Sequence, residues 1–139
     1  MKLVLDSSVI AKLFFKEAGS DSAIKLMEIG DEKDIEFLAS DLVIYEVGNT
    51  IWKNLRRKNK DGGRYIKLLF LLNIDFISID DSLASEALDV AQRYNITYYD
   101  GVHMVVGKKN KATLVTQDKV LLKKFKSTSS IKEVLERIE

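Results

Sequence analysis

The segment Lys2–Ile10, which reads KLVLDSSVI, decides the fold. Its first residues, Lys2–Leu5, form a short β-rich run that stops at Asp6, which predicts a buried strand opening into a loop. The residues from Ser7 to Phe15 then have the pattern of a helix. A buried strand followed directly by a helix is typical of a parallel sheet that helices cover on both faces.

The rest of the chain repeats this alternation of short apolar runs and helices. An apolar patch ends at Ala39–Ser40, and further strands are expected at Phe76–Ile79 and at Ala112–Val115. Helices are expected near residues 20–29, 41–58, 64–73, 83–94, 100–108 and 119–125, with a Ser/Thr linker after the last. The segment Ile131–Ile138 fits an amphipathic helix or a strand. We therefore predict an α/β fold of three layers, α/β/α, around a central, mostly parallel sheet.

Length and composition exclude several classes of protein. The chain has 139 residues and a formal net charge of +1, from 22 Lys and Arg against 21 Asp and Glu. We expect residues 1–139 to form one domain, and the balanced charge excludes a histone-like binder. The absence of cysteine excludes disulfides and zinc–thiolate sites. No segment resembles a signal peptide or membrane span, so we expect a cytoplasmic protein.

Four acidic residues stand where an ordinary surface acid would not be expected. Asp6 directly follows the first strand, and Asp118 follows the run TLVT after one residue. In an open parallel sheet ligands bind beyond the carboxyl ends of the strands, so both carboxylates are expected at one crevice. Asp100 precedes an apolar helix, and Glu46 lies within a mostly apolar stretch.

Each of these acids has a structural alternative. Asp6, Asp100 and Asp118 all stand at predicted helix starts, where they could act as N-caps. Glu46 could belong to a solvated stripe with Asn49 and Lys53, which share its helix face. If the acids converge instead, their repulsion is relieved by a hard cation such as Mg²⁺ or Mn²⁺. With one histidine, His103, and no thiol, only an all-oxygen metal site is plausible.

Four short pieces occur together in an order that resembles the PIN-domain ribonucleases, the VapC-type toxins of bacterial and archaeal toxin–antitoxin pairs. The resemblance covers nearly the whole chain. The pieces are Leu5-Asp6-Ser7-Ser8-Val9-Ile10, Tyr45-Glu46-Val47-Gly48-Asn49, Tyr98-Tyr99-Asp100-Gly101-Val102-His103 and Leu114-Val115-Thr116-Gln117-Asp118.

This resemblance implies an acidic metal site. Its members would be Asp6, Glu46, Asp100 and Asp118, binding Mg²⁺, with Mn²⁺ as a substitute. Ser8 and Thr116 would be supporting polar groups, and Asn49 would orient ligands or contact the substrate. Gly101 stands where relatives usually carry alanine, which predicts a looser start to that helix. His103 occupies a variable position, for which we expect a structural or surface role.

The implied chemistry is hydrolysis of RNA phosphodiester bonds. Water would attack phosphorus in line and leave a 5′-phosphate and a 3′-hydroxyl, with Asp6 or Asp100 as the group that positions or deprotonates it. A second fixed ion would need a fifth acid near Asp118, but Lys119 follows Asp118 instead. The sequence therefore favours one tightly bound metal, joined by a second that arrives with the substrate. The resemblance also implies a cognate antitoxin and a homodimer.

Three basic clusters are candidate RNA contacts. For any single cluster, however, a solvated lysine-rich surface is the better interpretation. They comprise Arg56, Arg57, Lys58 and Lys60; Lys108, Lys109 and Lys111; and Lys119, Lys123 and Lys124.

The sequence leaves two alternative functions open and disfavours two others. A housekeeping RNA-processing nuclease without an antitoxin and a non-catalytic RNA-binding subunit of the same fold stay open. A dehalogenase-like phosphatase would need a second Asp where Ser8 stands, and a receiver domain would need a pair of acids after the first strand.

Overall fold

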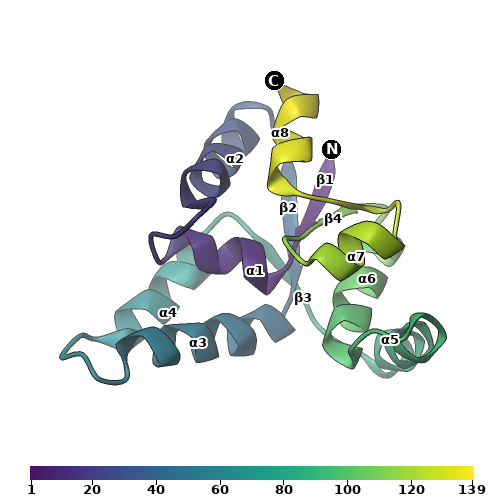
Figure 1. The fold of residues 1–139 in the computed structure, drawn as a ribbon, viewed down its shortest axis with the longest axis horizontal. Coiled ribbons are helices and arrows are strands. Elements are labelled where there is room, and N and C mark those ends of the chain that lie inside the picture. The colour runs from purple at the N-terminus through teal and green to yellow at the C-terminus, as the bar shows by residue number, and fades with distance from the viewer.

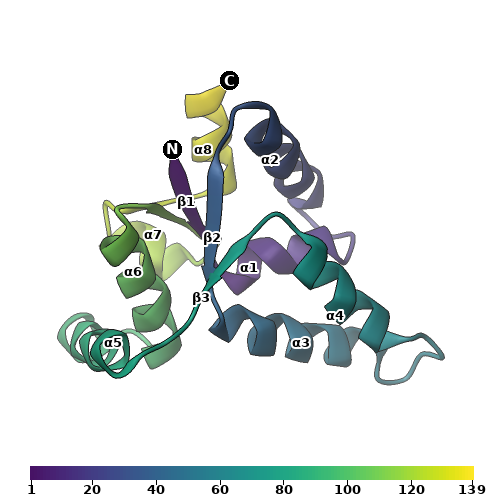
Figure 2. The same ribbon diagram turned by 180° about the vertical axis from the view of Figure 1, so that it is seen from behind.

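A computed structural model describes residues 1–139, and it has the α/β/α architecture that the sequence predicts. Helices flank a central sheet on both sides (Figures 1 and 2). The elements in chain order are β1 (Lys2–Leu5), α1 (Ser7–Ile10), α2 (Ser20–Glu32), β2 (Glu36–Ser40), α3 (Leu42–Leu55), α4 (Gly62–Leu71), β3 (Asp75–Ile77), α5 (Asp81–Tyr94), α6 (Tyr98–Asn110), β4 (Thr113–Val115), α7 (Lys119–Lys124), β5 (Thr128–Ser129) and α8 (Ile131–Ile138). No helix is both long enough and apolar enough to cross a membrane.

All five strands run parallel, in the order β3-β2-β1-β4-β5. The chain moves outward from β1 to β2 and β3, and then crosses to the other side of β1 to form β4 and β5. The boundary between β1 and β4 is therefore the point where the strand order reverses. In open parallel sheets, the carboxyl ends of strands at such a point form the usual ligand crevice.

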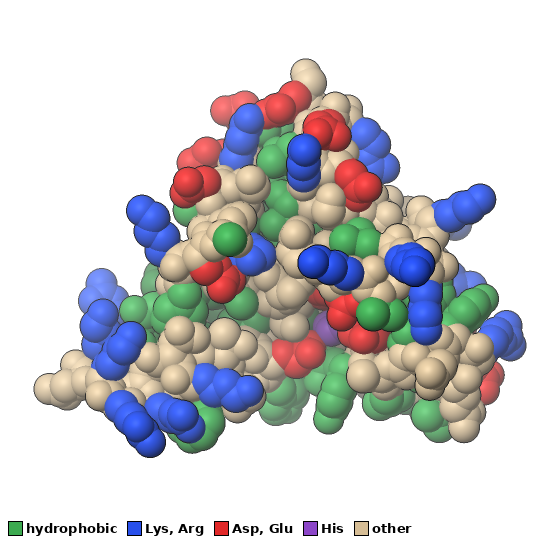
Figure 3. All heavy atoms as spheres, in the orientation of Figure 1, with side chains coloured by type: hydrophobic (Ala, Val, Ile, Leu, Met, Phe, Trp, Pro, Cys, Tyr) green, Lys and Arg blue, Asp and Glu red, His purple; other side chains and the backbone are tan.

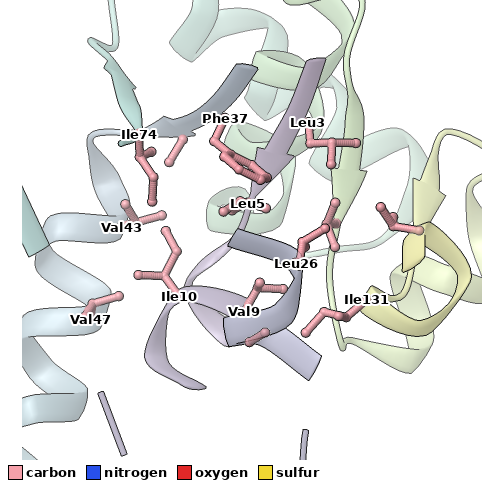
Figure 4. Close-up of a cluster of buried hydrophobic side chains, with 14 of the residues drawn as sticks. Leu3, Leu5, Val9, Ile10, Leu26, Phe37, Val43, Val47, Ile74 and Ile131 are labelled. Carbon is pink, nitrogen blue, oxygen red and sulfur yellow. The ribbon is translucent and has the colours of Figure 1, made fainter. Parts of the chain in front are cut away.

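The alternation of side chains along the strands divides the core into two clusters. Leu3 and Leu5 of β1 point into one cluster with Phe37 of β2, whereas Val4 points into the other with Leu38. The first cluster packs against α1, α2, α3, α4 and α8 (Figure 4). The second packs against α5, α6 and α7. Because β1, β2 and β4 are buried on both faces over most of their length, their sequences are mostly apolar.

Most of the predicted elements are confirmed, with shifted ends. The helix expected to reach residue 58 ends at Leu55, and the helix expected from Asp100 begins at Tyr98. The Ser/Thr segment expected as a linker contains the strand β5, which pairs with β4. The last element is a helix, because the Ser130 side chain and Glu133 form a reciprocal capping box at its start.

Gly101 has a different role from the one the sequence suggested. It lies inside α6 without interrupting that helix, and it is buried against α5. A β-carbon at this position would collide with the backbone carbonyl oxygen of Ala87. Glycine therefore allows α5 and α6 to pack closely, and the position does not loosen the helix start.

This packing predicts opposite outcomes for two glycine-to-alanine substitutions. Gly101→Ala should lower the free energy of unfolding by about 1–3 kcal/mol, because overpacking outweighs the better helix propensity of alanine. Gly48→Ala is the matched control in α3, where a β-carbon would meet only Ile66 Cδ1 at 3.5 Å. It should be neutral or stabilise by up to about 1 kcal/mol. Chemical denaturation measures both; equal effects would contradict the packing argument.

Candidate active site

Asp6 is fixed at the carboxyl end of β1 by hydrogen bonds to both of its carboxylate oxygens. Its side chain is buried, and Oδ1 accepts from the amides of Ser8 at 3.0 Å and Val9 at 3.2 Å and from the Ser8 hydroxyl at 2.5 Å. Oδ2 accepts from the hydroxyl of Thr116. Leu5 pairs in register with Val115, so Asp6 and Thr116, the next residues, lie at the same level of neighbouring strands.

Thr116 and Ser8 also tie the loop after β4 to the loop after β1. The amide of Asp118 donates to Thr116 Oγ1 at 3.0 Å, and the amide of Gln117 donates to Ser8 Oγ at 3.1 Å. Asp118 Oδ1 accepts from the amides of Val120 and Leu121, whereas Oδ2 accepts no hydrogen bond from the protein. The predicted supporting residues Ser8 and Thr116 thus hold the two loops together.

Capping and membership of one site are not alternatives for Asp6 and Asp118. Asp6 is the N-cap of α1 and Asp118 is the N-cap of α7, in both cases through Oδ1. Of the oxygens that do not cap, Asp6 Oδ2 accepts from Thr116, and Asp118 Oδ2 has no protein partner. Asp100 is not a cap, because Thr97 caps α6 by accepting from the Asp100 amide at 3.1 Å.

The carboxylates affect one another electrostatically. Burial raises the pKa of Asp6, although hydrogen bonds from Ser8 and Thr116 oppose the shift. Burial also raises the pKa of Asp100; its hydrogen bond with Thr97 opposes this, and the charges of Asp118 and Asp6 raise it further. Asp6, Asp100 and Asp118 therefore lie within electrostatic reach of one another. Their segments are far apart in the sequence.

Glu46 joins this group through the histidine of α6. His103 is buried, and its Nε2 lies 2.7 Å from Glu46 Oε1. Figure 3 shows acidic side chains around the histidine in the middle of one face. The contact is a feature that sequence reasoning missed, although His103 stands one helical turn after Asp100. Asn49 and Lys53 are exposed on the same helix, as a solvated stripe requires, whereas Glu46 is partly buried and contacts His103.

The donor atoms suit a hard divalent cation. They are carboxylate and hydroxyl oxygens, which Mg²⁺ and Mn²⁺ prefer. A cation would also relieve the repulsion that raises the pKa of Asp100. As the side chains stand, no group of three Asp, Glu or His residues has the geometry to hold a metal ion. The oxygen atoms of these carboxylates are chemically suited to such an ion. Their side chains would have to rotate to coordinate it together.

Two of the predicted basic clusters lie away from the carboxylates along the helices, whereas Lys119 of the third directly follows Asp118. Lys108 and Lys109 stand at the opposite end of α6 from Asp100, and both approach Glu86, Lys108 at 2.7 Å. Arg56 caps the carboxyl end of α3 and lies 5.4 Å from the Trp52 ring. Lys111 and Arg57 are exposed. Lys and Arg side chains flank the acidic centre on both sides of this face (Figure 3).

Comparison with known proteins agrees with this architecture. Residues 3–126 match the PIN domain family. Exonuclease VapC9 of Pyrobaculum aerophilum is 33% identical over 97 residues, covering 70% of this chain and 73% of that protein. Ribonuclease VapC3 of the same organism is 30% identical over 130 residues, covering 90% and 95%. A toxin–antitoxin complex from Klebsiella pneumoniae has the same fold, with a TM-score of 0.70, 16% identity and coverage of 93% and 97%. The chain therefore belongs to the PIN-domain family, in its VapC group.

Proposed function

We propose that this protein is an Mg²⁺-dependent ribonuclease that acts in the cytoplasm as the toxin of a toxin–antitoxin pair, with Mn²⁺ as a substitute metal. The observation that supports this proposal most is the electrostatic coupling of three carboxylates: Asp6 and Asp118 follow the neighbouring strands β1 and β4, and the pKa of Asp100 is raised by burial and further by the charges of Asp118 and Asp6. Glu46 is joined to them through His103. A set of caps that merely stabilised separate helices would not need to converge.

The carboxylates would divide the work of phosphodiester hydrolysis. Bound Mg²⁺ supplies a Lewis acid that polarises the phosphodiester and lowers the pKa of water. Asp6, which Ser8 and Thr116 hold rigidly, and Asp118, whose Oδ2 has no protein partner, suit metal ligation. Asp100 is half-buried with a raised pKa, which suits a carboxylate that ligates the metal through one oxygen and positions the attacking water with the other. Attack on phosphorus in line leaves a 5′-phosphate and a 3′-hydroxyl.

RNA is the substrate that the relatives support. One relative carries the name ribonuclease and another the name exonuclease. Exposed tyrosines precede two of the acids: Tyr45 stands before Glu46, and Tyr98 and Tyr99 stand before Asp100. Aromatic side chains stack on unpaired bases, which favours single-stranded or looped RNA. The basic clusters Arg56–Arg57 and Lys108–Lys111 would add contacts with phosphates.

An exposed apolar surface on α3 and α4 suits an antitoxin segment. A hollow of about 290 Å³ lies between these helices, and Ile51, Trp52 and Ile66 line it. Phe70 and Leu71 of α4 are also exposed. Such surfaces accept the apolar face of an amphipathic helix. An arginine from the same segment would pair with the carboxylates and compete with the metal.

Three further functional predictions from the sequence stay predictions. The homodimer is one, and the exposed tyrosines beside the acids offer apolar surface for it. An RNA-processing nuclease without an antitoxin is the second. A non-catalytic RNA-binding subunit is the third, and the complete set of four acids argues against it.

RNA cleavage by the purified protein should require Mg²⁺ or Mn²⁺ and stop in EDTA. Asp6→Asn, Asp100→Asn and Glu46→Gln should each lower the rate by about a hundredfold or more, because even changes around metal ligands cost about 10–100-fold. Cleavage of a panel of linear RNAs measures these rates. Circular RNAs in the same panel show whether cleavage is internal, since only internal cleavage opens a circle. The control Asp89→Asn changes an exposed acid of α5 and should keep the parent rate. Full activity in EDTA or in Asp6→Asn would contradict the metal mechanism.

Thermal melts should reveal the cost of keeping Asp100 charged where it is buried and repelled by neighbouring carboxylates. Because its pKa is raised in the folded protein, its contribution to stability is present below about pH 4 and lost as pH rises through the raised pKa. Metal-free Asp100→Asn should therefore melt at the same or a higher temperature than the parent at about pH 7, and this advantage should vanish near pH 4. A lower melting temperature of the variant at both pH values would contradict a raised pKa of Asp100 in the folded protein.

Mg²⁺ should change that ranking. At a hundredfold excess over its dissociation constant, it should stabilise the parent by about 2.7 kcal/mol and Asp100→Asn much less. Melts with EDTA and with excess Mg²⁺ make the comparison. Identical responses of the two proteins would remove Asp100 from the site.

Expression without an antitoxin should slow cell growth, and Asp100→Asn should relieve the defect because it removes the activity. Trp52→Glu, which places a charge in the α3–α4 hollow, should remain toxic but resist rescue by the antitoxin. Growth curves measure all three proteins. A harmless parent would favour an RNA-processing role, and an equally toxic Asp100→Asn protein would show that nuclease activity is not the cause.

A further inference from the structure

The contact between His103 and Glu46 links the two helical layers at the carboxyl edge of the sheet. The buried residues of α3 pack in the first core cluster, and those of α6 pack in the second. The 2.7 Å contact from His103 Nε2 to Glu46 Oε1 joins these two helices directly. The imidazole is 2% exposed and the Glu46 side chain 28% exposed, so a buried anchor holds a carboxylate that reaches towards solvent.

The surroundings of the imidazole indicate which nitrogen carries the proton. Nδ1 is buried and has no hydrogen-bond partner. A proton on Nδ1 would be a buried donor without an acceptor, which is strongly unfavourable, whereas an unpaired acceptor is better tolerated. The proton is therefore expected on Nε2, where it is donated to the Glu46 carboxylate.

We propose that His103 is a positioning residue, which holds Glu46 through an Nε2–H hydrogen bond in the orientation that the metal site needs. The inference rests on the proposed function. Glutamate on a helix has several rotatable bonds, and without this donor the partly exposed Glu46 is free to turn into solvent. Hydrogen bonds that orient ligating carboxylates commonly change metal affinity by about 10–100-fold.

The role requires a donor at Nε2, and two substitutions separate this from packing. His103→Gln keeps an N–H donor near the position of Nε2. His103→Phe keeps a ring of similar size but has no donor. If His103 only filled space, Phe would be the better replacement and neither variant would change metal binding.

Two measurements test the proposal with the full chain. Calorimetric titration with Mg²⁺ alone should give a dissociation constant about 10–100-fold weaker for His103→Phe and within about threefold of the parent for His103→Gln. NMR of ¹⁵N-histidine-labelled parent needs no assignment, because the chain contains one histidine. It should show the Nε2–H tautomer, and the signal should shift with Mg²⁺ in the parent but not in Glu46→Ala.

The outcomes separate a failure of the positioning role of His103 from a failure of the proposed ribonuclease function. Equal Mg²⁺ affinity of the parent and a folded His103→Phe, or an Nδ1–H tautomer in the parent, would overturn the positioning role and leave the proposed function intact. If His103→Phe does not fold, the tautomer and the Mg²⁺-induced shift still decide. A parent that neither binds Mg²⁺ nor cleaves RNA would overturn the proposed function, and the positioning role with it.

Discussion

The hydrogen bond from Thr116 to Asp6 across the β1–β4 boundary is the interaction on which the site depends. It exists because Leu5 and Val115 pair in register, so that the residues after them meet at the reversal point of the sheet. It holds a carboxylate in a buried position, and it places the Asp118 loop beside it, since the Asp118 amide donates to the same threonine oxygen. A register slip of one residue would separate the two loops.

The same arrangement explains why one residue can serve both folding and chemistry. Asp6 and Asp118 cap α1 and α7 with one oxygen each, so the fold determines their orientation before any ligand arrives. Asp100 does not cap a helix, because Thr97 caps α6. Burial raises the pKa of Asp100, and the charges of Asp118 and Asp6 raise it further. Negative charge concentrated in this way would destabilise the metal-free protein, and a cation that bound there would stabilise it.

The sequence predicted those features that follow from local pattern. The apolar runs located β1 and β4, and the acids after them could be placed at one edge because parallel strands end together. The two-residue strand β5 was missed because its polar residues pair through the backbone. The contact between Glu46 and His103 was missed because it joins residues 57 positions apart on helices from different layers. Capping by Asp6 and Asp118, one of the two readings that the sequence offered, is confirmed, and it is compatible with a role in the proposed site because each carboxylate has two oxygens.

The most direct test of the account is a crystal structure of the protein grown with Mn²⁺, with the ion located from its anomalous scattering. We predict a peak at the carboxyl ends of β1 and β4, ligated by Asp6, Asp118, Glu46 and a rotated Asp100 carboxylate. The peak should be lost in Asp100→Asn crystals. A structure without an ion there at saturating Mn²⁺, or with the peak unchanged in that variant, would contradict the central claim that these acids form a metal site.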